Sequence, residues 1–128
     1  MCAAGGDVQV RHRGTTGGSI AHADPAADYP PVMLVMGAQI KVQSAKGEQV
    51  VKIQSFLKGL LQTDLLPGEL LTEIQIPKLP EGSGSSYQRP HRVEGNFAIV
   101  NAAAMIEKGF KSGLSVWAVW ARPRFWWK

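Results

Sequence analysis

The 128-residue chain lacks the residues that define several classes of protein. Its one cysteine, Cys2, cannot form an internal disulfide or a cysteine metal cluster, which fits a reducing cytosol. No apolar run approaches the roughly 20 residues that a membrane-spanning helix needs. The first residues also lack the basic and apolar regions of a secretory signal. We therefore expect a cytoplasmic protein with no membrane association, folded as one domain or as a piece of one.

Acidic residues are absent from the last part of the chain. Residues 108–128 hold five Lys or Arg and all four tryptophans, whereas residues 1–107 hold nine basic and ten acidic residues. The net charge of +4 therefore belongs to the tail, and we expect no nucleic-acid binding by the main body. The simplest interpretation of residues 112–128 is an atypical, unstructured extension, for example from a shifted reading frame. The alternative is a tail that binds nucleic acid or an anionic membrane.

The apolar pattern predicts an α+β fold with helices early and antiparallel strands later. Residues 8–12 alternate like a short strand, and residues 18–22 begin a helix. Asp24 and Pro25 have the residue types of an N-cap and first helical position, so a second helix is expected there, interrupted at Pro30 and Pro31. A short helix is expected after Ser55, over 56–61. The expected strands are 38–42 and 48–53 as a hairpin, 70–76, 86–92 at a sheet edge or bulge, and 97–106, for which a helix is the alternative.

The segment most informative about chemistry is the glycine turn over residues 15–19, Thr-Thr-Gly-Gly-Ser. A turn that opens a helix presents unpaired N–H groups and partial positive charge, which suits a phosphate. We expect Gly17 and Gly18 to take left-handed backbone angles and let the main chain approach a ligand. By composition alone, a capped helix after a tight turn explains the same residues better than a phosphate site does.

Three ordered blocks carry a family resemblance: residues 10–30, residues 66–77 (Leu-Pro-Gly-Glu-Leu-Leu-Thr-Glu-Ile-Gln-Ile-Pro) and residues 95–100 (Gly-Asn-Phe-Ala-Ile-Val). The first block resembles the second flavin-binding motif of the medium, FAD-binding subunit of the molybdenum hydroxylases. That family includes xanthine dehydrogenase and aerobic carbon monoxide dehydrogenase. The likeness covers roughly residues 7–110. It implies part of an FAD-binding domain of the vanillyl-alcohol-oxidase/xanthine-dehydrogenase type.

The resemblance implies FAD as the cofactor and assigns its contacts. Asp28 and Leu70 match flavin-contacting positions, and Arg89 stands where the family has a lysine that reaches the flavin. Asn96 stands where the family has an aspartate. No catalytic side chain and no metal ligand is expected. The residues expected to cradle the FAD diphosphate are Thr15, Thr16, Gly17, Gly18 and Ser19.

The resemblance also implies an electron-transfer role. The family's FAD subunit passes electrons from iron–sulfur clusters to an external acceptor. It works beside a molybdopterin-containing large subunit and a small subunit that carries 2Fe-2S clusters. The expected division is 1–79 as the second half of the FAD-binding domain, 80–111 as the start of a truncated C-terminal subdomain, and 112–128 as the tail. Such a fragment is expected to be inactive alone and to hold FAD weakly or not at all. The alternative function is a non-catalytic phosphate- or nucleotide-binding module.

Overall fold

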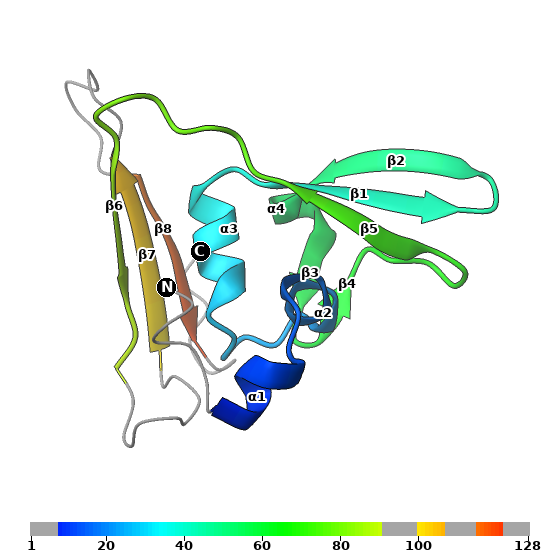
Figure 1. Cartoon of the computed structure of the whole chain (residues 1–128), viewed down its shortest axis with the longest axis horizontal. Coiled ribbons are helices and arrows are strands. Elements are labelled where there is room, and N and C mark those ends of the chain that lie inside the picture. Colours follow the sequence, from blue (N-terminus) through cyan, green and yellow to red (C-terminus); the bar gives the residue numbers. More distant parts are fainter. Residues whose placement is uncertain (1–7, 91–99, 107–114, 122–128) are drawn as a thin grey trace.

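A computed structural model describes residues 8–90, 100–106 and 115–121 of the chain. Two antiparallel sheets lie on either side of helix α3 (Tyr29–Val35), as Figure 1 shows. The order of the first sheet, here called the arm, is β2 (Gly47–Lys52), β1 (Gln39–Ser44), β5 (Leu70–Gln75). The order of the second, here called the end sheet, is β6 (Gly84–Gln88), β7 (Val100–Ile106), β8 (Ser115–Ala121).

The remaining elements are short, and of these α2 and α4 pack against α3. Helix α1 (Val8–Arg13) leads through one turn into α2 (Thr16–His22). The single turn α4 (Ile53–Phe56) joins the arm to a small hairpin of β3 (Leu57–Gly59) and β4 (Gln62–Thr63). The predicted fold class, α+β with helices early and antiparallel strands later, is confirmed.

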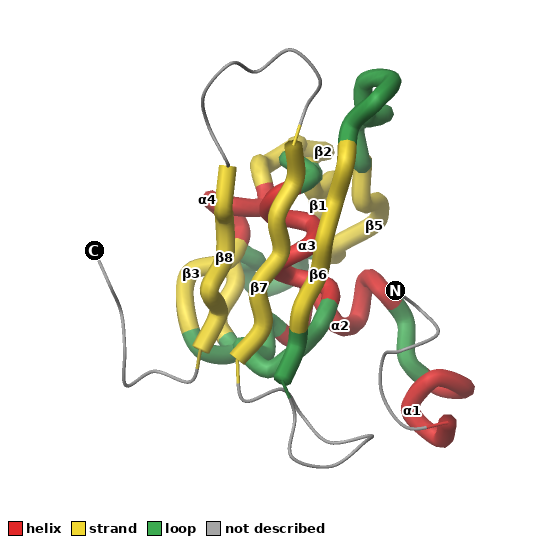
Figure 2. The backbone as a smooth tube through the Cα atoms, turned by 90° about the vertical axis from the view of Figure 1, so that its left-hand side faces the viewer, coloured by secondary structure: helices red, strands yellow, loops and turns green. Residues whose placement is uncertain are grey.

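The buried core lies where the helices pack against β1. Burial of apolar area is the main favourable term in folding, at about 25 cal/mol per Å². Helix α3 also packs on β7 and β8, so that it joins the core to the end sheet; Figure 2 shows that sheet in front of the helix. The core residues are Ile20, Met33, Ala38, Ile40, Val42, Ile53 and Phe56.

The strand predictions rest on alternation, and several are confirmed. The expected hairpin is β1 with β2, where Ser44 pairs with Gly47 across a tight turn. Gly47 has φ of +140°, a backbone angle that favours glycine. The strand predicted over 70–76 is β5. The edge strand predicted over 86–92 overlaps β6, which ends at Gln88 and lies at the edge of the end sheet; residues 91–92 lie outside the described residues. The strand predicted over 97–106 is found as β7, and its residues 97–99 lie outside the described residues.

One strand prediction and three helix predictions are wrong in detail. Residues 8–12 are helical. The strand prediction failed because alternation over five residues is too short to distinguish the period of a strand from that of a helix. Asp24 does not start a helix: its carboxylate accepts from Ala26 N at 2.8 Å and closes a turn. The prolines at 30 and 31 begin α3 instead of interrupting it, since a missing N–H costs little in a first helical turn. The helix expected over 56–61 ends at Phe56, where β3 follows.

The tail is also more ordered than expected. Residues 115–121, which fall within the segment expected to be unstructured, form β8 and pair antiparallel with β7. Their sequence, Ser-Val-Trp-Ala-Val-Trp-Ala, is rich in the β-branched and aromatic residues that favour strands. The segment therefore belongs to the end sheet.

Candidate functional site

The glycine turn is a capped helix start. The Thr15 side chain accepts from Gly18 N at 3.0 Å, and Ser19 N donates to the Thr15 carbonyl at 3.0 Å. The first N–H groups of a helix have no partner within it. The Thr15 side chain accepts the N–H group of Gly18. The N–H groups of Thr16 and Gly17 are therefore the main-chain donors that the turn offers to an anion. The Thr15 hydroxyl keeps its own hydrogen for donation.

Neither glycine of the turn is needed for an unusual backbone angle, and only Gly18 is needed for space. The expectation of left-handed angles is wrong, because Gly17 and Gly18 lie inside α2 with helical backbone. A Cβ at Gly18 would lie 2.8 Å from Thr15 Oγ1, closer than real Cβ contacts. A Cβ at Gly17 would lie 3.6 Å from Leu71 Cδ2, an ordinary contact. Gly18 is therefore the position where a Cβ would disturb the cap that Thr15 makes.

A largely buried ion pair joins Asp28, the residue before α3, to Arg89, the residue after β6. Arg89 Nη1 donates to both carboxylate oxygens of Asp28, at 3.0 and 3.3 Å, and the two side chains are 13% and 15% exposed. The phenol of Tyr87 donates to Asp28 Oδ1 at 2.6 Å. Tyr87 and Arg89 are two residues apart, so they project from the same face of an extended chain. Two residues that the resemblance assigned separately to the flavin, Asp28 and Arg89, are thus one unit.

Burial and the Asp28 carboxylate keep Tyr87 in its neutral form. Burial raises the pKa of the Tyr87 phenol, and the hydrogen bond and charge of Asp28 raise it further. The Arg89 cation and the Asn101 amide act in the opposite direction on this pKa and are outweighed. The phenol therefore stays a donor to Asp28 throughout the neutral range.

Asn101 completes the surroundings of the ion pair. It is 0% exposed on β7, and its Nδ2 donates to the carbonyl of Ala27 at 3.0 Å. Sequence reasoning missed this residue, because it was counted as part of an apolar strand. The signal was present: a single amide stands within Val100-Asn101-Ala102-Ala103-Ala104, where a polar side chain must find a buried partner.

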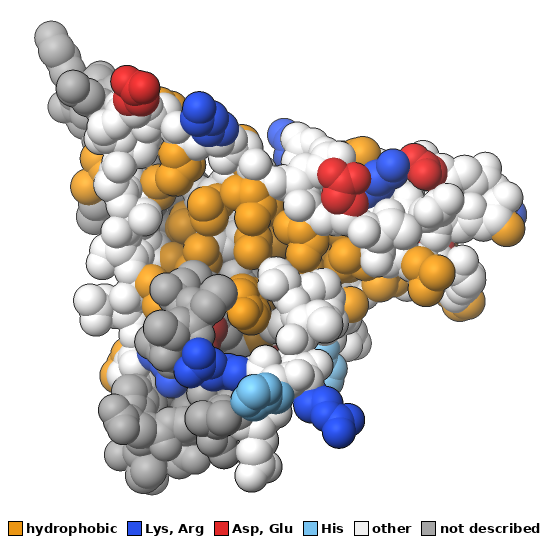
Figure 3. Space-filling view, in the orientation of Figure 1, with side chains coloured by type: hydrophobic (Ala, Val, Ile, Leu, Met, Phe, Trp, Pro, Cys, Tyr) orange, Lys and Arg blue, Asp and Glu red, His pale blue; other side chains and the backbone are white. Residues whose placement is uncertain are grey.

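Leu70 is on another part of the molecule. It begins β5 and is 70% exposed, whereas its neighbour Leu71 is partly buried against the core. Alternation along a strand points these two leucines to opposite faces. Leu71 thus faces the Gly17 turn, and Leu70 is presented to the surface. Figure 3 shows apolar side chains gathered in a band between the end sheet and the arm.

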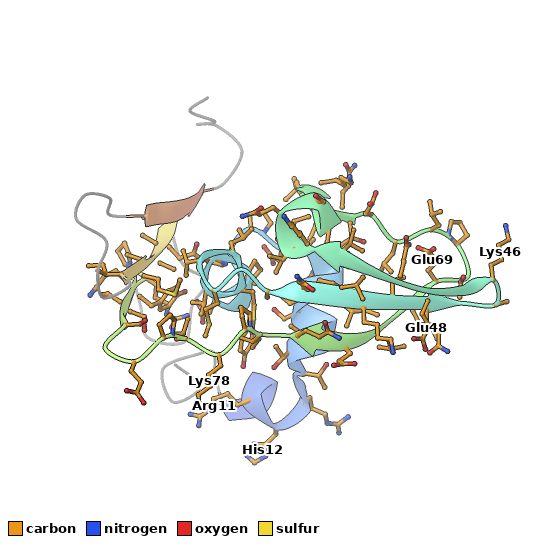
Figure 4. The ribbon with its side chains drawn as sticks, turned by 90° about the horizontal axis from the view of Figure 1, so that it is seen from above. Arg11, His12, Lys46, Glu48, Glu69 and Lys78 are labelled. Atoms are coloured by element: carbon orange, nitrogen blue, oxygen red, sulfur yellow. The ribbon has the colours of Figure 1, made fainter. Side chains whose placement is uncertain are left out.

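The exposed charges fall into separate regions. Figure 4 places Lys46, Glu48 and Glu69 at the tip of the arm, whereas Arg11 and His12 project from α1. A strand over residues 8–12 would place Arg11 and Arg13 on the same side, but both lie in α1, where residues two apart do not share a face. Within residues 8–90, 100–106 and 115–121, no group of three His, Cys, Asp or Glu side chains is arranged to hold a metal ion. None of the helices described in those ranges is long and apolar enough to cross a membrane.

The family of the chain follows from comparison with known proteins. Residues 1–79 match the model of the FAD binding domain in molybdopterin dehydrogenase. The chain belongs to this family. The predicted family and its cofactor, FAD, are thereby confirmed.

Individual relatives agree with this assignment. The chain is 42% identical over 98 residues to the 6-hydroxypseudooxynicotine dehydrogenase complex subunit alpha of Paenarthrobacter nicotinovorans, covering 77% of this chain and 33% of that protein. It is 37% identical over 100 residues to the carbon monoxide dehydrogenase medium chain of Afipia carboxidovorans, covering 78% and 35%. A solved carbon monoxide dehydrogenase of Hydrogenophaga pseudoflava, which lacks the Mo-pyranopterin moiety of its molybdenum cofactor, superimposes with a TM-score of 0.80 at 33% identity, over 83% of this chain and 37% of that one. The chain therefore spans about a third of the length of the relatives it matches.

Proposed function

We propose that the chain is part of the FAD-binding, electron-transferring subunit of a molybdenum hydroxylase. Its FAD receives electrons from iron–sulfur clusters and passes them to an external acceptor. The flavin supplies the redox chemistry, and the protein supplies binding and electrostatic tuning. The observation that carries the proposal is the Thr15-capped turn at Gly18, because it belongs to the segment matched by the FAD-binding family and leaves no room for a Cβ.

The proposed FAD contacts come from two regions. The diphosphate is held by the N–H groups and hydroxyls of the turn, and the Asp28–Arg89 pair lies toward the rest of the cofactor together with Leu70. Because Asp28 is paired with Arg89, the anionic cofactor does not meet an uncompensated carboxylate. The residues proposed for the diphosphate are Thr15, Thr16, Gly17, Gly18 and Ser19.

The proposed partners are a molybdopterin-containing large subunit and a small subunit with 2Fe-2S clusters, in a cytoplasmic enzyme. The relatives named as a medium chain and as a complex subunit support this arrangement. We also propose that residues 1–79 serve the FAD-binding domain and that residues 80–111 begin a second subdomain. Within the tail of residues 112–128, residues 115–121 then extend that subdomain, since β8 joins its sheet.

A titration with FAD tests the proposed cradle. The relatives are more than twice as long, so we expect the 128-residue chain to bind FAD weakly, which NMR chemical shifts detect at millimolar cofactor. FAD should shift the amides of residues 15–19, and Gly18→Val should abolish these shifts. Lys46→Ala, at the tip of the arm, is the control and should leave them unchanged (Figure 4).

Two further measurements separate the alternatives. If ADP and FAD bind equally and FAD causes no shifts around Asp28 and Arg89, the chain is a phosphate-binding module and the flavin assignment is wrong. The glycine that matches Gly18 is also changed to valine in a full-length carbon monoxide dehydrogenase medium chain. Retention of all its FAD would overturn the cradle.

A further inference from the structure

We propose that Asn101 is a positioning residue for the flavin site, acting through the loop that carries Asp28. This inference rests on the proposed function, because it concerns the same cofactor. Asn101 does not contact the proposed diphosphate cradle. Its amide, on β7, holds the backbone next to Asp28 and thereby determines where the Asp28–Arg89 pair lies.

The contact with Ala27 is specific and long-range. Asn101 Nδ2 donates to the Ala27 carbonyl at 3.0 Å, across 74 positions of sequence, and Asn101 is fully buried. The Ala27 carbonyl belongs to the peptide group that leads into Asp28. Its direction therefore sets the backbone from which the Asp28 carboxylate projects.

Local contacts alone do not hold the carboxylate in place. Within the loop, Asp24 accepts from Ala26 N at 2.8 Å through its side chain and from Ala27 N at 3.0 Å through its carbonyl. These bonds close the turn but leave its orientation toward the end sheet open. The end sheet supplies that orientation twice: Asn101 from β7 holds the backbone, and Tyr87 from β6 holds the carboxylate.

The cost of burying the Asn101 oxygen without a partner indicates that the N–H group of this side chain is the part that acts. Asn101 Oδ1 is buried and has no hydrogen-bond partner among the described residues. A buried acceptor without a partner destabilises a fold, and an apolar residue in this otherwise apolar strand segment would avoid that penalty. The part of the side chain that acts is therefore its amide N–H group, which donates to Ala27, while the same side chain also hydrogen-bonds to Tyr87.

The test uses two substitutions in the full 128-residue chain, with FAD affinity followed by NMR shifts. Asn101→Leu removes the donor and should weaken FAD binding by about tenfold. Asn101→Asp has the same shape; its carboxyl donates to Ala27 when protonated and cannot when ionised. Burial raises the pKa of such a carboxyl, with Asp28, Tyr87 and Arg89 as the ionisable groups around it. The affinity of this variant should match the unaltered chain at about pH 5 and be about tenfold weaker at about pH 8.

The control and the outcomes separate positioning from general destabilisation. Ile53→Val loosens the core without touching the loop and should leave FAD affinity unchanged while the chain is folded. Equal affinities for Asn101→Leu and Ile53→Val, or a pH-independent Asn101→Asp, would overturn this inference and leave the proposed function standing. If Asn101→Leu does not fold, the two pH values of Asn101→Asp decide. Absence of FAD-dependent shifts in the unaltered chain would overturn both.

Discussion

Tyr87 and Asp28 stand 59 residues apart in the sequence and are joined by a hydrogen bond of 2.6 Å from the phenol to Oδ1. With the Arg89 guanidinium on the same carboxylate, this bond ties the end sheet to the loop that precedes α3. The loop leads into a helix whose other neighbours form the core. The packing of the end sheet against the rest of the fold and the geometry of the proposed flavin site therefore depend on the same contact.

The unaltered chain should lose stability as the pH becomes alkaline, and Tyr87→Phe should remove this loss. The pKa of Tyr87 is raised above its ordinary value of 10.0, so the folded state favours the neutral phenol. This contribution is complete below pH 10.0 and is lost as the pH rises toward the folded-state pKa. Urea unfolding between about pH 7 and pH 11 should show this loss in the unaltered chain and not in the variant, which should be less stable at neutral pH by about 1–2 kcal/mol. Tyr29→Phe, which keeps Tyr87, should retain the loss; identical pH profiles for Tyr87→Phe and the unaltered chain would contradict the assignment.

The Asp28–Arg89 pair should show strong coupling in a double-mutant cycle. Removing one partner leaves the largely buried charge of the other without this ion pair, so Asp28→Asn or Arg89→Gln should each cost about 3 kcal/mol. The double variant should cost less than the two single changes together. The matched control is the exposed pair Lys58–Asp64, at 3.2 Å, whose coupling should not exceed about 0.5 kcal/mol. Additive effects of the two changes at Asp28 and Arg89 would show that the pair is not a unit.

The two glycines of α2 should respond to alanine with opposite signs. Gly17→Ala meets only ordinary contact at Leu71 Cδ2 and should stabilise the helix by up to about 1 kcal/mol. Gly18→Ala drives a Cβ against Thr15 Oγ1 and displaces the cap, which should lower stability by about 1 kcal/mol. Thermal unfolding measures both. In a Thr15→Ala background the obstruction is gone, so Gly18→Ala should become stabilising; a destabilising effect there would place the obstruction elsewhere.

Local patterns predicted the strands better than the helix starts. The β1–β2 hairpin and β5 follow from alternation and turn residues, which are properties of neighbouring positions. The start of α3 depends on which of three prolines opens the helix, and Asp24-Pro25 has the same residue types as a true start. The turn at Asp24 is closed by Ala26, so local hydrogen bonding prevailed over helix capping there.

The site residues divide in the same way. The Thr15 cap is local and was within reach of sequence reasoning, although the helical angles of Gly17 and Gly18 were not. The pairing of Asp28 with Arg89 spans 61 positions and depends on how β6 meets α3, which no local pattern contains. The family resemblance pointed to both residues without showing that they touch. Asn101 was overlooked because its polar side chain is surrounded by alanines.

A strained pair of residues beside α2 leads to a last prediction. Leu61 has φ of +54°, a left-handed angle that is unfavourable for any residue with a Cβ, and its N–H donates at 3.1 Å to the carbonyl of Ala23, which has φ of +52°. The Leu61 side chain is 53% exposed, so its removal sacrifices little burial. Leu61→Gly should therefore change stability by about zero to +1 kcal/mol, because relief of strain offsets the entropy that glycine adds to the unfolded chain. Leu60→Gly, a neighbour that is 51% exposed and has no positive φ, should instead lose about 0.5–1 kcal/mol. Chemical unfolding of the two variants compares them directly, and equal losses would show that the left-handed angle at Leu61 carries no strain.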